Sequence, residues 1–244
     1  MLFRSRAVYV ESISNPLLKI PDLRAVVNFA KSHGLVSMID NTFPSPMNFN
    51  PIPFGFDVAL HSATKYLNGH SDVVAGVMVS SFDLIKKVTP LFNHLGGCLD
   101  PHACFLLHRG IKTLGVRVGY QNESALKISE ALEKCSKVAK VIYPGLKSHP
   151  DHLRAKEWFR GFGGMVSFEF NGSTEQADAA LKQLKIPFLA PSLGGVESAI
   201  ERRTRWAAEV AAGVPMTLCR FSVGIENVED IWADLSAAFK KVLG

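Results

Sequence analysis

Apolar residues occur in short blocks near the start of the chain, and each block has the length of one strand or one helix. Residues 7–12 (AVYVES) are predicted to form a buried strand, and residues 35–41 (LVSMIDN) the next one. Between them, residues 20–34 place their apolar side chains on one helical face and end at Gly34, a suitable C′ glycine. This pattern predicts a strand–helix–strand unit.

Two further strands are predicted at residues 56–65 (FDVALHSATK) and 73–81 (VVAGVMVSS). Strand–helix–strand connections of this length favour parallel pairing with right-handed crossovers, so the sheet should be mostly parallel. In such sheets, functional side chains gather at the carboxyl ends of the strands. Asp40 and Lys65 both stand at a predicted strand end.

The pattern changes near residue 101, where a long amphipathic helical region begins. Glycines interrupt the helical pattern of this segment, which connects the sheet domain to the rest of the chain. A smaller α+β domain should follow, with strands at 137–145, 163–170 and 217–224 and helices at 173–185 and 227–243. We therefore predict a partial large domain over residues 1–125 and a small domain over residues 126–244.

Composition narrows the class of protein further. The 244 residues are 47% hydrophobic, and the net charge of +5 comes from scattered basic residues, which disfavours a nucleic-acid partner. No apolar run is long enough to span a bilayer, so no membrane partner is expected. The four cysteines are few and form no CxxC pair, and the histidines show no metal-ligand spacing. These features predict a soluble cytoplasmic protein without a bound metal.

Lys65 is the first candidate for chemistry. It follows three small residues at the end of an apolar strand, where partial desolvation would lower its proton affinity. A neutral amine in that position can form a Schiff base with an aldehyde. The alternative is an ordinary exposed lysine at the end of a strand.

The residues around Lys65 favour the chemical interpretation. Ser62 and Thr64 supply hydroxyl groups for the phosphate of an aldehyde cofactor, and Asp40 ends a neighbouring apolar strand. A carboxylate there is costly unless it faces a cation such as a protonated pyridine nitrogen. Lysine on the aldehyde and aspartate on the ring nitrogen are the two contacts that pyridoxal 5′-phosphate chemistry requires.

Several segments together resemble the pyridoxal-phosphate enzymes of cysteine and methionine metabolism, the transsulfuration family that includes cystathionine γ-synthase, γ-lyase and β-lyase. The resemblance spans nearly the whole chain in family order, with 25 residues from Asn15 to Asp40 and 25 more to Lys65. A single short motif such as SATK would be weak, and the ordered set carries the weight. The matching segments are ESISNPLLKIPDL, MIDNTFPSP, DVALHSATKYLNGHSDVVAG, LGGCLDPHACFLLHRGIKTL, YPGLKSHPDH, GFGGMVSFEF, APSLGGVES and LCRFSVGIENVEDI.

The resemblance implies a fold and a role for each cofactor-site residue. The fold would be the α/β aspartate-aminotransferase-like arrangement, fold type I, with a partial large domain and a smaller C-terminal α+β domain. Lys65 matches the Schiff-base lysine and Asp40 the residue that pairs with the pyridinium nitrogen. Ser62 and Thr64 match the phosphate-binding hydroxyls. Asn15 matches an asparagine near the cofactor and the substrate carboxylate, although a turn residue before proline is its simpler interpretation.

Three residues of the second half match substrate-binding positions of the family. Arg220 matches the arginine that binds the substrate α-carboxylate, a task that suits its planar fork. Ser192 matches a serine beside that carboxylate, or is a simple loop residue. Glu197 stands where γ-active members often carry an acidic residue.

The chain departs from the family pattern in two places. It begins almost at the ESxSNP segment, so we expect the family's N-terminal third to be absent, with its glycine-rich phosphate loop and its ring-stacking tyrosine. Apolar helix faces and strand edges should then need cover from another chain. The segment 199–217 lacks the family's usual pattern before the arginine strand, which predicts an altered substrate mouth.

Two functions follow as expectations. The first is a pyridoxal-phosphate-dependent transsulfuration enzyme of γ-synthase or γ-lyase type, which acts on cystathionine, cysteine or an activated homoserine. The second is an inactive fragment that serves as an interaction or regulatory subunit, or an incomplete gene model. In either case we expect a homo-oligomer or association with a full-length relative, and these residues do not separate synthase from lyase.

Overall fold

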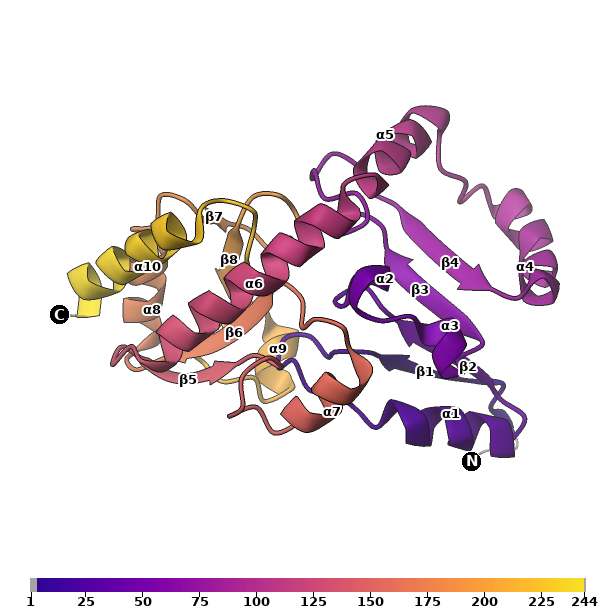
Figure 1. Ribbon diagram of the computed structural model, residues 1–244, viewed down its shortest axis with the longest axis horizontal. Helices are drawn as coiled ribbons and strands as arrows, with labels where there is room; N and C mark the ends of the chain where they lie inside the picture. Colours follow the sequence, from indigo (N-terminus) through magenta and orange to yellow (C-terminus); the bar gives the residue numbers. More distant parts are fainter. Residues whose placement is uncertain (1–3, 244) are drawn as a thin grey trace.

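The computed structural model describes residues 4–243 and contains two β-sheets connected by long helices (Figure 1). The first sheet has four strands in the order β1-β2-β3-β4, and the second has five in the order β5-β6-β9-β8-β7. Both sheets carry helices, so the chain is a mixed α/β protein as predicted. None of the helices within these residues combines the length and the apolar content needed to cross a membrane.

The first sheet is parallel over its first three strands. β1 pairs in parallel with β2, and β2 with β3. Helix α1 makes the crossover between the first two strands, which is the unit predicted from the sequence. The strands are β1 (Ala7–Glu11), β2 (Val36–Asp40), β3 (Val58–Ser62) and β4 (Gly76–Ser80).

Helix α1 (Leu23–Ser32) forms where its apolar spacing predicts it. The Asp22 side chain accepts a hydrogen bond from the amide of Ala25, which caps the helix, and Val27 is buried on its inner face. Gly34 follows with a φ of 60°, a left-handed conformation that glycine adopts without cost. The predicted C′ glycine is therefore confirmed.

The structure corrects two details of the predicted sheet. β1 is an edge strand whose residues are alternately exposed and half-buried, and not the buried strand that its apolar sequence suggests. β4 runs antiparallel to β3, because the segment between them, residues 63–75, forms turns rather than a crossover helix. Helix α4 (Phe82–Leu95), which was not predicted, follows β4 and buries none of its residues.

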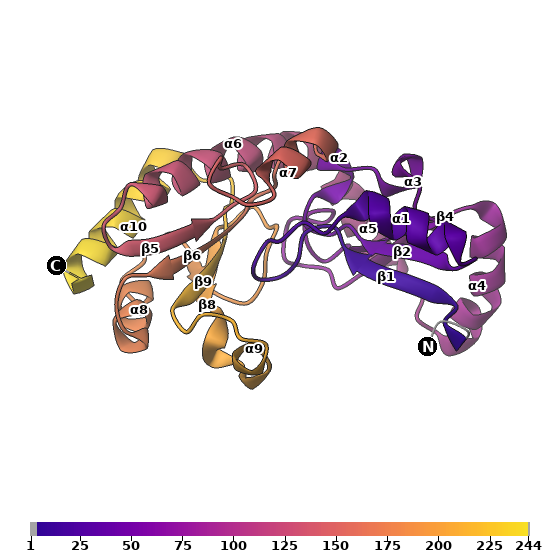
Figure 2. The ribbon, with the colours of Figure 1, turned by 90° about the horizontal axis from the view of Figure 1, so that it is seen from below.

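The long helical region after residue 101 contains two helices rather than one. The part of the chain around the first sheet is called the first lobe, and the part around the second sheet the second lobe. The second of the two helices, α6, runs along one side of the molecule from the first lobe to the second (Figures 1 and 2). It passes through residue 125, and the division at that position stays a prediction. The remaining helices of this half are α2 (Ser45–Asn48), α3 (Pro51–Phe54), α5 (Pro101–Ile111) and α6 (Leu114–Glu133).

The second lobe has a well-covered sheet. Helices α6, α8 and α10 pack around it, and Phe168, Phe170 and Phe239 meet in its core, with 4.8 Å between the ring centroids of Phe170 and Phe239. Its strands are β5 (Val138–Ile142), β6 (Met165–Phe170), β7 (Phe188–Leu189), β8 (Ala199–Arg202) and β9 (Leu218–Ser222). Its other helical segments are α8 (Thr174–Leu181), the 3-10 turn η2 (Arg203–Arg205), α9 (Ala207–Ala211) and α10 (Val228–Leu243), while α7 (His152–Trp158) packs against the core of the first sheet.

Candidate functional site

The carboxyl ends of the parallel strands bring polar side chains to one edge of the first sheet. Register places Glu11 at the end of β1 opposite Asp40 at the end of β2, and Ser62 ends β3. Together with Asn15 and Lys65 these residues line a cavity of about 170 Å³. The location agrees with the rule that parallel sheets carry their sites at the carboxyl ends of the strands.

Lys65 lies in the turn after β3 and is half-buried. Its amide donates to the carbonyl of Ser62 at 3.1 Å, and its Nζ donates to Ser192 Oγ at 3.4 Å. Burial lowers the pKa of Lys65, and the positive charge of Arg220 lowers it further, while Glu201 opposes both effects. The reduced proton affinity favours the neutral form of the amine, which is the form that acts as a nucleophile.

Asp40 is held by two donors at the end of β2. Its Oδ1 accepts from the amide of Thr42 at 2.8 Å, and its Oδ2 accepts from the hydroxyl of Tyr9 at 3.3 Å. Burial and the charge of Asp40 raise the pKa of Tyr9 to about 12, so the tyrosine remains a donor at neutral pH. The two contacts fix the carboxylate at the wall of the cavity.

The two predicted phosphate-binding hydroxyls do not line the same cavity. Ser62 lines the 170 Å³ cavity, and its amide donates to Thr42 Oγ1 at 2.8 Å. The Thr64 hydroxyl accepts from the amide of Ala75 at 3.0 Å and lines a neighbouring cavity of about 560 Å³. Their shared role in phosphate binding stays a prediction.

Arg220, in β9, connects the second sheet to the cofactor-site residues of the first. Its Nη1 donates to Asn15 Oδ1 at 3.0 Å, and its Nη2 donates to the carbonyl of Pro191 at 2.7 Å and to Glu201 Oε1 at 2.9 Å. The side chain is 3% exposed, and burial lowers the pKa of Arg220 to about 10. The guanidinium remains a cation at neutral pH, and Glu201 is its anionic partner.

Ser192 and Glu197 belong to the loop that packs over the Lys65 turn. Gly194 has a φ of 72° there, and a Cβ at this position would lie 2.8 Å from the amide nitrogen of Tyr66, so only glycine permits the close approach. This packing brings Ser192 to Lys65. Glu197 is exposed and lines the 560 Å³ cavity together with Asp72.

Two acidic residues of the site were not found from the sequence. Glu11 accepts from the amide of Asn15 at 3.2 Å, and burial raises the pKa of Glu11. Glu201 is bonded to Arg220 in the second sheet. The parallel pairing of β1 with β2 would have pointed to Glu11, but the position of Glu201 follows only from the register of β8 on β9, which the sequence pattern does not reveal.

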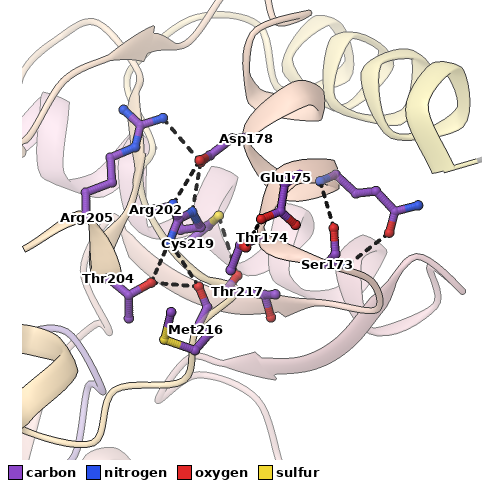
Figure 3. Close-up of polar contacts among 11 residues, drawn as sticks. Ser173, Thr174, Glu175, Asp178, Arg202, Thr204, Arg205, Met216, Thr217 and Cys219 are labelled. Atoms are coloured by element: carbon purple, nitrogen blue, oxygen red, sulfur yellow. Dashed lines mark hydrogen bonds and ion pairs between the residues drawn. The ribbon is translucent and has the colours of Figure 1, made fainter.

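The segment 199–217, which departs from the family pattern, is anchored by ion pairs. Arg202 Nε and Nη2 each donate to one oxygen of Asp178 on α8, both at 2.8 Å, and Arg205 Nη2 lies 3.2 Å from Asp178 Oδ1 (Figure 3). Arg202 also donates to Thr204 Oγ1 at 2.7 Å. These contacts lie beside Cys219 and not beside Lys65, so they fix the path of the segment.

The donor set of the 170 Å³ cavity fits pyridoxal phosphate. Lys65 offers an amine of lowered pKa for the aldehyde, Asp40 a carboxylate for the ring nitrogen, and Ser62 a hydroxyl for the phosphate. Among residues 4–243 there is no group of three histidine, cysteine or acidic side chains arranged to hold a metal ion. Lys65 would hold the cofactor's aldehyde end and Asp40 its ring nitrogen.

Comparisons with known proteins agree with this geometry. The profile of the Cys/Met metabolism PLP-dependent enzyme family matches residues 3–240. The chain is 45% identical to cystathionine gamma-lyase of Dictyostelium discoideum over 246 residues and 43% identical to cystathionine beta-lyase of Lactococcus lactis subsp. cremoris over 248. These alignments cover 98% and 97% of this chain, but 64% of the length of either relative.

A solved structure gives the same result at the level of the fold. The structure of cystathionine gamma synthase from Xanthomonas oryzae pv. oryzae, in complex with aminoacrylate and cysteine, superposes with a TM-score of 0.94 at 41% identity. The match covers 98% of this chain and 64% of that one. Relatives with three different names, a gamma-lyase, a beta-lyase and a gamma synthase, are thus similarly identical in sequence to this chain. The chain spans about 64% of the length of these relatives. On this basis the chain belongs to the pyridoxal-phosphate-dependent enzymes of cysteine and methionine metabolism.

Proposed function

We propose that this chain forms part of the active site of a transsulfuration enzyme of cystathionine γ-synthase or γ-lyase type, built on the fold type I arrangement. One observation carries the proposal: Lys65 and Asp40 face one cavity from adjacent parallel strand ends, and Arg220 reaches the same region through Asn15. An amine, a carboxylate and a carboxylate-binding guanidinium are the three groups that an amino-acid reaction on pyridoxal phosphate needs.

Each residue has a task that its environment supports. Pyridoxal phosphate, when bound, supplies an electron sink for the substrate's α carbon. Lys65 Nζ, with its lowered pKa, accepts and returns a proton at the reacting end of the cavity. Asp40, fixed by Thr42 and Tyr9, keeps negative charge against the ring nitrogen.

The substrate's carboxylate would bind to Arg220. Its Nη1 already holds Asn15 Oδ1 at 3.0 Å, so the amide and the guanidinium form one polar surface. Ser192, which accepts from Lys65 Nζ, lies beside this surface and can donate to the carboxylate in turn. The predicted carboxylate-binding roles of Arg220, Asn15 and Ser192 are thus part of this proposal.

The far end of the substrate would extend into the 560 Å³ cavity. Glu197 and Asp72 give that cavity two carboxylates, while Phe188 and Leu193 make much of its wall apolar. This combination suits a flexible chain with an ammonium group near its far end, which cystathionine carries beside its second carboxylate, and Glu197 favours a γ-type reaction. We therefore include cystathionine, cysteine or activated homoserine as the substrate class, in a cytoplasmic setting.

The first lobe favours association with a second copy or a full-length relative. Helix α4 buries no residue, and β4 is the outer strand of its sheet. Exposed apolar side chains cluster here, with Phe82 79% exposed and Leu95 82% exposed. The same observation supports the alternative function, an inactive interaction subunit that docks through this face.

Cofactor retention tests the proposal. The purified chain is incubated with pyridoxal phosphate, gel-filtered, reduced with borohydride and mapped by mass spectrometry. We expect visible absorption to be retained and the adduct to map to Lys65, and a Lys65→Ala variant to lose both while it stays folded. Lys31→Ala, a change at an exposed lysine of α1, is the matched control and should retain the absorption.

The opposite result is equally informative. If the adduct forms equally in Lys65→Ala, the assignment of Lys65 is wrong, and if the chain retains no cofactor, the residues present do not suffice to bind it. A folded chain that binds no cofactor but elutes with a second polypeptide would favour the interaction subunit.

A further inference from the structure

A buried carboxylate stands directly behind the arginine that would bind the substrate. β8 and β9 are antiparallel, and their register places Glu201 opposite Arg220. The Glu201 side chain is 7% exposed and its Oε1 lies 2.9 Å from Arg220 Nη2. Cross-strand neighbours in this register hold their side chains on the same face, so the pairing follows from the sheet itself.

Glu201 is shared between two arginines. The same Oε1 also accepts from Arg203 Nη1, and Arg203 Nη2 donates in turn to Glu209 at the start of α9. The Arg203 side chain is 11% exposed, and its Nε is buried without a hydrogen-bond partner in the described part of the chain. A buried charge is tolerated only when it is compensated, so the four groups form one neutral unit of two cations and two anions.

Arg220 also contacts the loop that contains Ser192, the hydrogen-bond partner of Lys65. Its Nη2 donates to the carbonyl of Pro191 at 2.7 Å, and the next residue, Ser192, accepts from Lys65 Nζ. The guanidinium therefore fixes the loop beside the amine. A shift of Arg220 would move both the carboxylate-binding surface and the immediate environment of Lys65.

We propose that Glu201 is the positioning residue of the substrate-carboxylate site, because it fixes the Arg220 guanidinium against Asn15 and Pro191. Arg203, which is also paired with Glu209, shares the Glu201 carboxylate and so weakens the hold of Glu201 on Arg220. The inference rests on the proposed function, in which Arg220 receives the substrate's carboxylate. It assigns a task to the segment 199–217, whose sequence departs from the family pattern.

The charges around Lys65 make the proposal measurable without turnover. Asp40 and Glu11 face its cavity from β2 and β1, while Arg220 and Glu201 approach from β9 and β8. Arg220 lowers the pKa of Lys65 and Glu201 raises it. Loss of the Glu201 charge should lower the pKa of Lys65 further. Loss of the Arg203 charge should leave Arg220 as the only arginine paired with Glu201, and the pKa of Lys65 should then rise.

The experiment is competitive labelling of amines with trace acetic anhydride across a pH series, followed by peptide mass spectrometry. Lys65 is measured relative to the exposed Lys31 in the same sample. We expect Glu201→Gln to increase the relative labelling of Lys65 at neutral pH about three- to tenfold, since a single charge close to a partly buried group shifts its titration strongly. Arg203→Met should decrease it.

A matched control comes from the opposite face of β8. Asp178→Asn removes a carboxylate from the Arg202 pair, a more exposed ion pair on the other face of the strand, since neighbouring residues of a strand point to opposite faces. This variant should leave the labelling of Lys65 unchanged. If the role of Glu201 were purely structural, the labelling of Lys65 would change in the same direction in all three variants, or in none of them.

Unchanged labelling of Lys65 in a folded Glu201→Gln variant would overturn the proposal. If that variant does not fold, Arg203→Met still tests the proposal, because unchanged or increased labelling of Lys65 in that variant would contradict it. The readout needs neither cofactor nor turnover. An enzyme that binds no cofactor would therefore disprove the proposed function and leave the Lys65 shifts intact, whereas absent shifts in an active enzyme would disprove this inference alone.

Discussion

The two sheets differ in how completely this chain covers them. In the second sheet the outer strands β5 and β7 have exposed residues, but all five residues of β9 are buried and the helices around it bring Phe239 against Phe168. In the first sheet β1 and β4 are edge strands with exposed residues, and α4 buries none of its residues. Yet the first sheet carries Lys65 and Asp40, while the second supplies Arg220.

This difference separates the source of stability from the place of the chemistry. The second lobe has a core made of its own residues, so it can hold Arg220 and Glu201 in a fixed register. The first lobe places Lys65 and Asp40 correctly but leaves apolar surface in contact with water. The candidate site thus combines residues from a lobe with a core of its own and residues from a lobe with exposed apolar surface.

The largest effect should come from removing a core ring in the second lobe. Phe221, at the centre of β9, is fully buried, whereas Phe82, in α4, is 79% exposed. We expect Phe221→Ala to lower the free energy of unfolding by about 3–5 kcal/mol, through lost burial and a cavity. Phe82→Ala should change it by less than about 0.5 kcal/mol.

Urea unfolding followed by circular dichroism measures both values, with the slope of the transition as a check on two-state behaviour. Equal losses in the two variants would contradict the comparison, because they would mean that α4 is packed in solution as firmly as β9.

The same contrast explains what the sequence could and could not predict. The apolar blocks of β2 and β3 predicted where Asp40 and Lys65 stand, because a strand end is a local feature. Glu201 was missed because the run ERRTR resembles a solvated surface, and only the pairing of β8 with β9 buries it. Helix α4 was not predicted because Pro90 lies within its sequence and its apolar face packs into no core. The individual roles of the site residues remain predictions.

A smaller effect is expected from the ion pair that anchors the segment 199–217. Asp178 and Arg202 have side chains that are 27% and 10% exposed, and Asp178→Asn should cost about 1–2 kcal/mol, between the values for surface and buried pairs. Arg205, whose side chain is 41% exposed, is the control, and Arg205→Gln should cost less than about 0.5 kcal/mol.

The pH dependence gives this prediction a sign. Hydrogen bonds from Arg202 lower the pKa of Asp178 below its ordinary value of 3.8. Stability from the pair is then complete above that value and is lost as the pH falls towards the lower pKa of the folded protein. The gap between wild type and Asp178→Asn should therefore be constant from pH 7 to about 5 and close at lower pH. A gap that persists at low pH would show that packing, and not charge, anchors the segment.

The smallest effect on stability, and the most direct test of the uncovered lobe, concerns Leu91 of α4, which is 64% exposed. Leu91→Glu should change the free energy of unfolding by less than about 0.5 kcal/mol, because the residue packs on little within this chain. If the α4 face mediates association, the same change should shift the sedimentation coefficient towards that of the monomer, since a buried unpaired carboxylate opposes docking. Leu153→Glu, at an equally apolar position on α7 that is 82% exposed, provides the control and should leave association unchanged. Association that resists Leu91→Glu but not Leu153→Glu would place the contact on α7, and the exposed apolar face of α4 would then not be the surface that another chain covers.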